Sequence, residues 1–236
     1  MNNKICVFDF ETDGSDPSEC SPVQLSAVMV DAQRLEIIED SLFNVYLKPE
    51  RIENAKDKVD ISIYDDSDIL EWHGKIKGVD KTEIFNKWLE YPDQKHSWNQ
   101  FINYLDTYHA VDKSKKSQFS APKACGYNIL RFDMKIIQRL SEKYGNLNKE
   151  KVTNIFHPRD QVDIMNIAWL WFENNRDIKS LALDNLRTYL GIDKTNAHDA
   201  SKDVMDCAEI LTRFLRLHRR LSKKVQFKGS FSSNSI

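Results

Sequence analysis

The sequence has no long hydrophobic run. Nowhere in its 236 residues does a stretch approach the ~20 consecutive apolar residues that a helix needs to cross a bilayer. No apolar segment follows a basic start, as it would in a secretory leader. These absences predict a cytoplasmic protein with no membrane partner.

Cysteine is scarce and scattered. Cys6, Cys20, Cys125 and Cys207 are the only four, and no two of them have the Cys-x-x-Cys spacing. That spacing is typical of structural zinc sites, and closely spaced cysteines are typical of disulfide frameworks. We expect reduced, mostly buried thiols.

An excess of charge of either sign is also lacking. Lys and Arg number 34 and Asp and Glu number 36, which gives a net charge of -2. An anionic partner would therefore be held by a local basic patch or a bound metal rather than by the field of the whole molecule. The composition neither indicates nor excludes nucleic acid. It does contain 41% hydrophobic residues, enough for the core of one domain of the larger ordinary size.

Hydrophobic patterning predicts an α/β protein, because strands dominate early and helices dominate late. The expected strands are 5–10, 23–30, 42–47 and 123–127, and the expected helices are 82–90, 98–108, 133–144, 162–172, 181–189 and one that starts near residue 199. We expect one domain over residues 1–221 with a charged insertion at about 53–122. Residues 222–236 are polar and serine-rich, which predicts a disordered tail.

Four carboxylates are candidates for a metal site. Asp9 and Glu11 are two apart on an expected strand, so they project from the same face and would repel each other unless a divalent cation lay between them. Asp133 opens an expected helix, and Asp203 lies in the first turns of the last one. Oxygen ligands of this kind favour Mg²⁺ or Mn²⁺ over zinc.

His198 is a candidate general base. It precedes Asp203 by five positions, which on a continuous helix would turn the two side chains apart, so we place it in the loop that enters the helix. An imidazole with a pKa near 6.5 suits proton abstraction from a water molecule near neutral pH.

Each candidate has a plain structural explanation when taken alone. Asp133 and Asp199 are also typical helix N-caps, an Asp-x-Glu at a strand end is commonly a solvated edge, and a histidine before a helix is commonly a surface or capping residue. Only the occurrence of all five residues in one order favours catalysis.

Three motifs carry a resemblance to a known family. They are FDFETDG at 8–14, GYNILRFD at 126–133 and AHDASKDV at 197–204, and they are supported by PVQL at 22–25 and LDNL at 183–186. In these the chain resembles the DEDDh 3′ to 5′ exonucleases over roughly residues 5–215. Within that family it looks most like the nuclease domain of bacterial exonuclease I.

The resemblance implies a ribonuclease H-like fold, a mixed five-stranded sheet flanked by helices with an insertion of helices and loops before the fourth strand. It also implies a nuclease that uses two divalent metal ions, Mg²⁺ or Mn²⁺, to release 5′-mononucleotides from the 3′ end of single-stranded DNA. Asp9, Glu11, Asp133 and Asp203 would hold the metals, beside His198. The substrate-binding residues would be Thr12, Asp13, Gly14, Asn128 and Phe132.

Two other functions stay open. The first is the same chemistry on RNA, and the second is a catalytically silent nucleic-acid-binding module on the same fold. The presence of all five catalytic residues argues against the silent module. The sequence does not indicate protein partners.

Several further residues have two explanations. Trp72, Trp88, Trp98 and Tyr104 are candidates for stacking on bases, although the last three lie on apolar helix faces, which favours the core. Asp13 departs from the family pattern, and we expect a solvated turn residue there. A basic cluster near the end of the chain either tracks phosphates or stabilises a helix C-terminus; its members are Arg213, Arg216, Arg219, Arg220, Lys223 and Lys224.

Overall fold

The structure is a computed structural model that describes residues 2–55, 59–111, 117–195 and 199–224. Its centre is a mixed six-stranded sheet. The strands are β1 (Lys4–Thr12), β2 (Pro22–Asp31), β3 (Glu36–Ile37), β4 (Phe43–Tyr46), β5 (Lys123–Gly126) and β6 (Gln161–Asp163). They are ordered β3-β2-β1-β5-β6, with β4 also paired to β2. β1 is antiparallel to β2 and parallel to β5, and β5 is parallel to β6.

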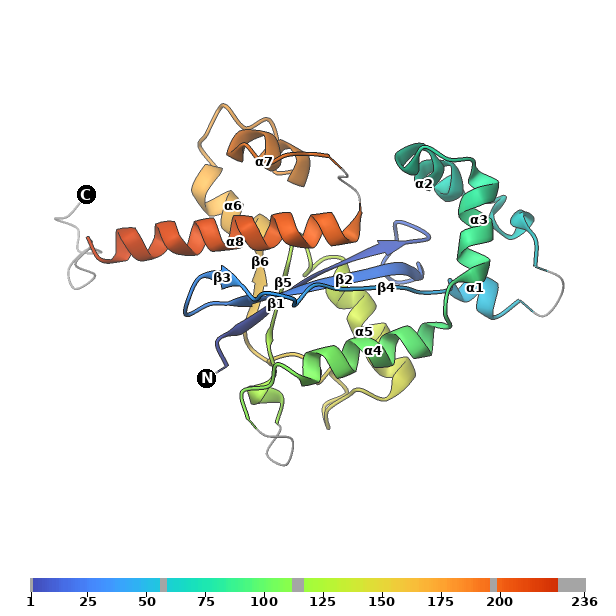
Figure 1. The fold of residues 1–236 in the computed structure, drawn as a ribbon, viewed down its shortest axis with the longest axis horizontal. Coiled ribbons are helices and arrows are strands. Elements are labelled where there is room, and N and C mark those ends of the chain that lie inside the picture. Colours follow the sequence, from blue (N-terminus) through green and yellow to red (C-terminus); the bar gives the residue numbers. More distant parts are fainter. Residues whose placement is uncertain (1, 56–58, 112–116, 196–198, 225–236) are drawn as a thin grey trace.

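Helices cover both faces of this sheet (Figure 1). They are α1 (Glu50–Glu53), α2 (Ile69–Lys77), α3 (Lys81–Glu90), α4 (Gln94–Asp106), α5 (Asp133–Tyr144), α6 (Ile164–Phe172), α7 (Leu183–Leu190) and α8 (Ala200–Ser222), with short 3-10 turns η1 (Ile61–Tyr64) and η3 (Gln118–Ser120). In Figure 1, α6, α7 and α8 lie above the sheet, α4 and α5 lie below it, and α1 to α3 form a group beyond one end.

The alternation of side chains along β1 separates two cores. Phe8 and its neighbours at even positions pack with Trp98 and Phe101 of α4 and with Ile136 of α5. Val7, at an odd position, faces the other core, which is built mainly from the apolar face of α8 together with α6 and α7. Because successive strand residues point to opposite faces, the odd positions of β1 end beneath α8.

A third, smaller core joins the helices beyond the end of the sheet. Trp88 and Phe85 of α3 pack with Tyr64 of η1 and Leu70 of α2, and Val23 of β2 connects this cluster to the sheet. The α2 and α3 pair is thus fixed beside the ends of β1 and β2.

The α/β architecture predicted from the sequence is confirmed. The four predicted strands are present, and so are the predicted helices. The prediction missed the two-residue β3, the short helix α1 and the whole of α2. It was also wrong at residues 162–163, where the start of the predicted helix 162–172 instead belongs to strand β6 (Gln161–Asp163), and Asp163 at the end of that strand caps α6 by accepting a hydrogen bond from the Met165 amide.

The segment predicted to be an insertion has two parts. The helices α1 to α3 form their own small core, whereas α4 contributes Trp98 and Phe101 to the main core beneath the sheet. None of the helices in the described ranges has the length and apolar content that a bilayer crossing requires.

Candidate active site

Three carboxylates converge above the end of β1. Asp9 and Glu11 project from the same face of that strand, and Asp203 approaches from the first turn of α8. One oxygen from each lies within 4.8 Å of the others, and none of the three residues is fully exposed. The sequence pattern therefore predicted a real cluster built from residues far apart in the chain.

Asp133 is not one of these three residues, but its charge acts on Asp9. It is the first residue of α5, is 3% exposed, and accepts a hydrogen bond from the Phe10 amide at 3.1 Å. This bond ties α5 to β1 between Asp9 and Glu11. Burial raises the pKa of Asp133 to about 7, against the lowering effect of its backbone hydrogen bonds.

Burial and mutual repulsion disfavour ionisation of the other carboxyls. The pKa of Asp9 is raised well above its ordinary value, first by burial and then by the charges of Asp133, Glu11 and Asp203. The pKa of Glu11 is raised to about 8, first by burial and then by Asp203. A cation among these oxygens would remove the repulsion and keep the group ionised. The donor set, carboxylate oxygens alone, fits a hard divalent ion.

Arg187 is a part of this site that the sequence analysis did not identify. Its side chain is 1% exposed and makes three ion pairs, to Asp203 at 2.6 Å, to Asp206 at 2.8 Å and to Asp184 at 2.9 Å. One guanidinium therefore locks α7 to the first turns of α8 and orients the Asp203 carboxylate. An arginine three positions after Asp184 in the segment before the last motif was the available signal.

The start of α8 is fixed by its N-cap. Asp199 accepts a hydrogen bond from the Ser201 amide at 3.0 Å, which confirms the capping interpretation for this residue. His198, the predicted general base, lies outside the described residues. Its role stays a prediction.

Asn128 occupies a strained turn after β5. Its φ is 59°, and its amide donates to Asp163 Oδ1 at 2.9 Å. The same aspartate accepts from the Leu130 amide at 3.2 Å, so β6 shapes the turn that leads to Asp133. Phe132 is the N-cap residue of α5 and packs partly against the lower core. The substrate-binding role predicted for Asn128 and Phe132 remains a prediction.

The loop that follows β1 is held from several sides. The Thr12 hydroxyl donates to the Gly14 carbonyl at 2.6 Å, and the Thr12 carbonyl contacts Nε2 of His73 of α2 at 2.9 Å. A Cβ on Gly14 would lie 3.3 Å from Cβ of Cys20, a tight approach.

Asp13 corrects one expectation. It is 5% exposed rather than solvated, and its carboxylate accepts from the Ser21 amide at 2.6 Å and the Tyr64 hydroxyl at 3.1 Å. Its own amide donates to the Ser21 carbonyl at 2.9 Å. Asp13 therefore braces the loop against η1, and its amide is already engaged within the protein.

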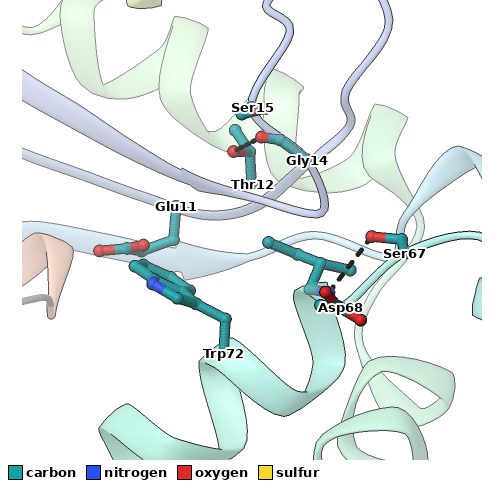
Figure 2. Close-up of a pocket in the computed structure, with 8 residues that line it drawn as sticks. Glu11, Thr12, Gly14, Ser15, Ser67, Asp68 and Trp72 are labelled. Atoms are coloured by element: carbon teal, nitrogen blue, oxygen red, sulfur yellow. Dashed lines mark hydrogen bonds between the residues drawn. The ribbon is translucent and has the colours of Figure 1, made fainter.

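A cavity of about 450 Å³ opens beside Glu11. Figure 2 shows Glu11, Thr12, Gly14 and Ser15 on one side, facing Ser67, Asp68 and Trp72 on the other. Its far wall is thus the start of α2. The Trp72 ring lies beside the Glu11 carboxylate in this view and is 44% exposed.

The remaining aromatic candidates belong to the core, as the apolar helix faces indicated. Trp88 and Trp98 are 3% and 0% exposed, and the Tyr104 hydroxyl donates to the Ser41 carbonyl at 2.8 Å.

Part of the basic cluster has a structural role. Arg216 donates to the Leu35 carbonyl and Arg219 to the Gln33 carbonyl, at 2.8 and 2.9 Å. Arg213 donates to the Leu190 carbonyl at 2.8 Å. These arginines fasten α8 to the turn between β2 and β3 and to the end of α7.

The order of the strands and the helices on both faces of the sheet match the fold of the exonuclease I nuclease domain, an α/β fold of the ribonuclease H-like kind. The chain is 26% identical over 218 residues to exodeoxyribonuclease I of Escherichia coli K12, a match that covers 86% of this chain and 38% of that protein. The resemblance to exonuclease I noted from the motifs is thereby confirmed. No protein-family model matches the chain.

Solved structures agree on the fold. Escherichia coli exonuclease I in complex with a dT13 oligonucleotide superposes with a TM-score of 0.62 at 17% identity, covering 94% of this chain and 43% of the other. Exonuclease I from Methylocaldum szegediense gives 0.59 at 20% identity, covering 92% and 41%. Cell-death related nuclease 4 gives 0.58 at 18%, covering 91% and 64%. The chain spans about two fifths of the length of the exonuclease I proteins it matches.

Proposed function

We propose that this protein is a metal-dependent 3′ to 5′ exonuclease of the DEDDh type that hydrolyses single-stranded DNA to 5′-mononucleotides. The observation that carries the proposal is the convergence of Asp9, Glu11 and Asp203 to within 4.8 Å on a fold shared with exonuclease I. Carboxylate oxygens are the ligands that a hard divalent ion prefers. A metal site therefore explains this cluster better than nucleophilic or acid–base catalysis by the carboxyl groups alone.

Each carboxylate has a distinct place in this proposal. Asp9 and Asp203 would hold the ions, and Glu11 and Asp133 would complete the coordination directly or through water. The ions, Mg²⁺ or Mn²⁺, would lower the pKa of a bound water and stabilise the departing 3′-oxygen. Arg187 orients Asp203 through a 2.6 Å contact to one carboxylate oxygen, Oδ1.

His198 is proposed to accept the proton of the attacking water. A neutral imidazole can accept a proton near pH 7, because the pKa of its protonated form is close to neutral. The covalent change would be one new phosphorus–oxygen bond from that water and cleavage of the bond to the 3′-oxygen of the preceding nucleotide.

The substrate would enter along the cavity beside Glu11. Trp72 presents an exposed ring there, and an aromatic face stacks on any base. Backbone groups of Thr12 and Gly14 lie in the same wall, where the terminal 3′-hydroxyl would be placed. We propose the domain as residues 1–221. The predicted tail at 222–236 begins one residue too early, because Ser222 is the last residue of α8. Residues 225–236 lie outside the described residues, and the cytoplasmic location stays a prediction.

DNA is favoured over RNA because most of the similar structures are exonuclease I proteins, one of them described as an ssDNA complex and others solved with dT13 or dA16 oligonucleotides, and the similar curated protein is an exodeoxyribonuclease. The test uses 5′-labelled single-stranded DNA and RNA of the same sequence, each with Mg²⁺ and with EDTA. We expect the DNA to shorten from its 3′ end only when Mg²⁺ is present.

Matched variants make this test specific. Asp9→Asn and Asp203→Asn should abolish shortening while the circular dichroism spectrum stays native, and His198→Ala should lower the rate severely with a smaller effect on binding. Shortening of RNA alone would favour the exoribonuclease. Oligonucleotide binding without any hydrolysis would favour the silent binding module.

A further inference from the structure

A cation from the helical group beyond the sheet reaches the carboxylate site. Lys77, the last residue of α2, places its Nζ 3.7 Å from Oδ2 of Asp199, the N-cap of α8. In Figure 1, α2 belongs to the right-hand helical group and α8 to the upper layer. The pair therefore spans two parts of the molecule that flank the end of β1.

The position of Lys77 is fixed by the residue one helical turn earlier. His73 is 3% exposed, and its Nε2 lies 2.9 Å from the Thr12 carbonyl at the end of β1. Residues four apart share one face of a helix. The contact that anchors α2 to β1 therefore also presents Lys77 toward the site.

The charge of Lys77 is felt at the site itself. Burial and the neighbouring carboxylates raise the pKa of Glu11, whereas the positive charge of Lys77 lowers it. Two other cations in the described part of the site already pair with carboxylates: Arg187 is buried among three of them, and Lys202 pairs with Asp206. A phosphodiester that approaches this acidic cluster needs a cation at its border.

The ion pair between Lys77 and Asp199 is weak enough for Lys77 to exchange the Asp199 carboxylate for another anion. The two side chains are 33% and 35% exposed and 3.7 Å apart, and ion pairs of this kind contribute little to stability because water competes for both charges. Asp199 has a separate structural task, performed by its other oxygen, Oδ1, which accepts from the Ser201 amide. Lys77 can therefore change partners while the cap of α8 stays intact.

We propose that Lys77 binds a backbone phosphate of the single-stranded nucleic acid in the active-site cleft, exchanging the Asp199 carboxylate for the phosphate. Such a contact positions the strand without reading its sequence. The inference rests on the proposed function, because it takes the cleft beside Glu11 as the path of the substrate.

The experiment measures equilibrium binding of a 5′-fluorescein-labelled dT oligonucleotide by fluorescence anisotropy, in Mg²⁺ and on the Asp9→Asn background so that hydrolysis does not intervene. Lys77→Gln should weaken binding about five- to tenfold. It should also reduce the slope of log K against log salt concentration by about 0.7, the value for one phosphate contact on a single strand. Lys77→Arg should restore most of the affinity.

The variant Asp199→Asn distinguishes two roles of Lys77: binding a phosphate, or only holding α2 to α8 through its ion pair with Asp199. Asparagine still caps a helix well, and it removes the anion that competes for Lys77, so affinity should rise by up to about fivefold. The matched control is Lys87→Gln on α3, which removes the same charge and the Glu83 ion pair in the same helical group and should leave affinity unchanged.

Other outcomes overturn the inference in distinguishable ways. If Lys77→Gln binds like its parent, or if Lys77→Gln and Asp199→Asn weaken binding equally, Lys77 has at most a structural role and the proposed function stands. If the Asp9→Asn parent itself does not bind the oligonucleotide, the proposed function fails together with this inference.

Discussion

At the scale of single residues, the site contains carboxyl groups whose raised pKa values disfavour ionisation. Glu11 carries a pKa of about 8, chiefly because it is buried and secondarily because Asp203 is near. Asp133 carries a pKa of about 7, chiefly through burial. A protein without metal would keep protons on these groups near neutral pH, so metal binding and proton release should be linked.

This linkage predicts a pH-dependent stability of the metal-free protein. Between about pH 4.5 and pH 8 the folded protein holds a proton on Glu11 that the unfolded chain has lost. The stabilising contribution of Glu11 is therefore complete below about pH 4.5 and disappears as the pH rises through about 8. In EDTA, the Tm should fall more between pH 6 and pH 8 for the natural protein than for Glu11→Gln.

Added Mg²⁺ should raise the Tm of the natural protein more at pH 8 than at pH 6, because at the higher pH fewer protons compete for the same oxygens. Thermal unfolding followed by circular dichroism gives all four values. An equal pH dependence in Glu11→Gln would show that the burial of this carboxyl has no energetic effect.

Arg187 should be needed for folding stability as well as for the site. Replacing it by Met leaves Asp203 and Asp206 without their guanidinium partner, at side chains only 13% and 5% exposed. Breaking such a buried pair from one side typically costs about 3 to 5 kcal/mol. Urea denaturation should show that loss in the free energy of unfolding.

Asp184→Asn is the matched control. Its side chain is 42% exposed, and its ion pair with Arg187 should therefore contribute under ~1 kcal/mol. If both variants lowered the free energy of unfolding by a similar amount, burial would not determine how much these ion pairs contribute to stability.

At the scale of helices and strands, the sequence predicted the elements whose apolar residues recur at one regular spacing. β1 and β2 are apolar strands, and α5 and α8 each have an apolar stripe, so the sequence predicted all four. The metal-ligand candidates lie on three of them, β1, α5 and α8. β6 was missed because its three residues run directly into α6 with no turn between them. α2 was missed because Gly74 and three charged residues, Glu71, Lys75 and Lys77, interrupt its short pattern.

The packing of β1 against β5 gives a prediction at this scale. A Cβ on Gly126 would lie 2.6 Å from the Phe8 carbonyl and 2.3 Å from Cγ2 of Ile129. Gly126→Ala should therefore push on the backbone just before Asp9 and lower the free energy of unfolding by about 1 to 3 kcal/mol.

The control for Gly126→Ala is Gly145→Asn. Gly145 caps α5 with φ 81° and has nothing within 4 Å of an added Cβ. Asparagine tolerates this conformation, so its change should stay under ~1 kcal/mol. Urea denaturation compares the two variants, and an equal effect would exclude the predicted clash.

At the scale of the whole molecule, three long-range contacts assemble the site and none of them is visible in a local pattern. Asp133 reaches the Phe10 amide, Arg187 reaches Asp203, and Lys77 reaches Asp199 across the end of β1. The motifs predicted which carboxylates would meet because the family resemblance encodes their order. They did not predict Lys77, which stands at an ordinary helix position, or Arg187, whose spacing from Asp184 indicates a pair within α7 but not the contact with Asp203.

The proposed mechanism depends on Asp9, Glu11 and Asp203 holding divalent ions together. The most direct test is the anomalous scattering of Mn²⁺ in a crystal of the natural protein soaked with the ion. We expect anomalous peaks within bonding distance of the carboxylate oxygens of Asp9, with Glu11 or Asp203 as a further ligand, and their loss in Asp9→Asn. Mn²⁺ bound elsewhere, with these three carboxylates left free of any peak, would contradict the proposed mechanism.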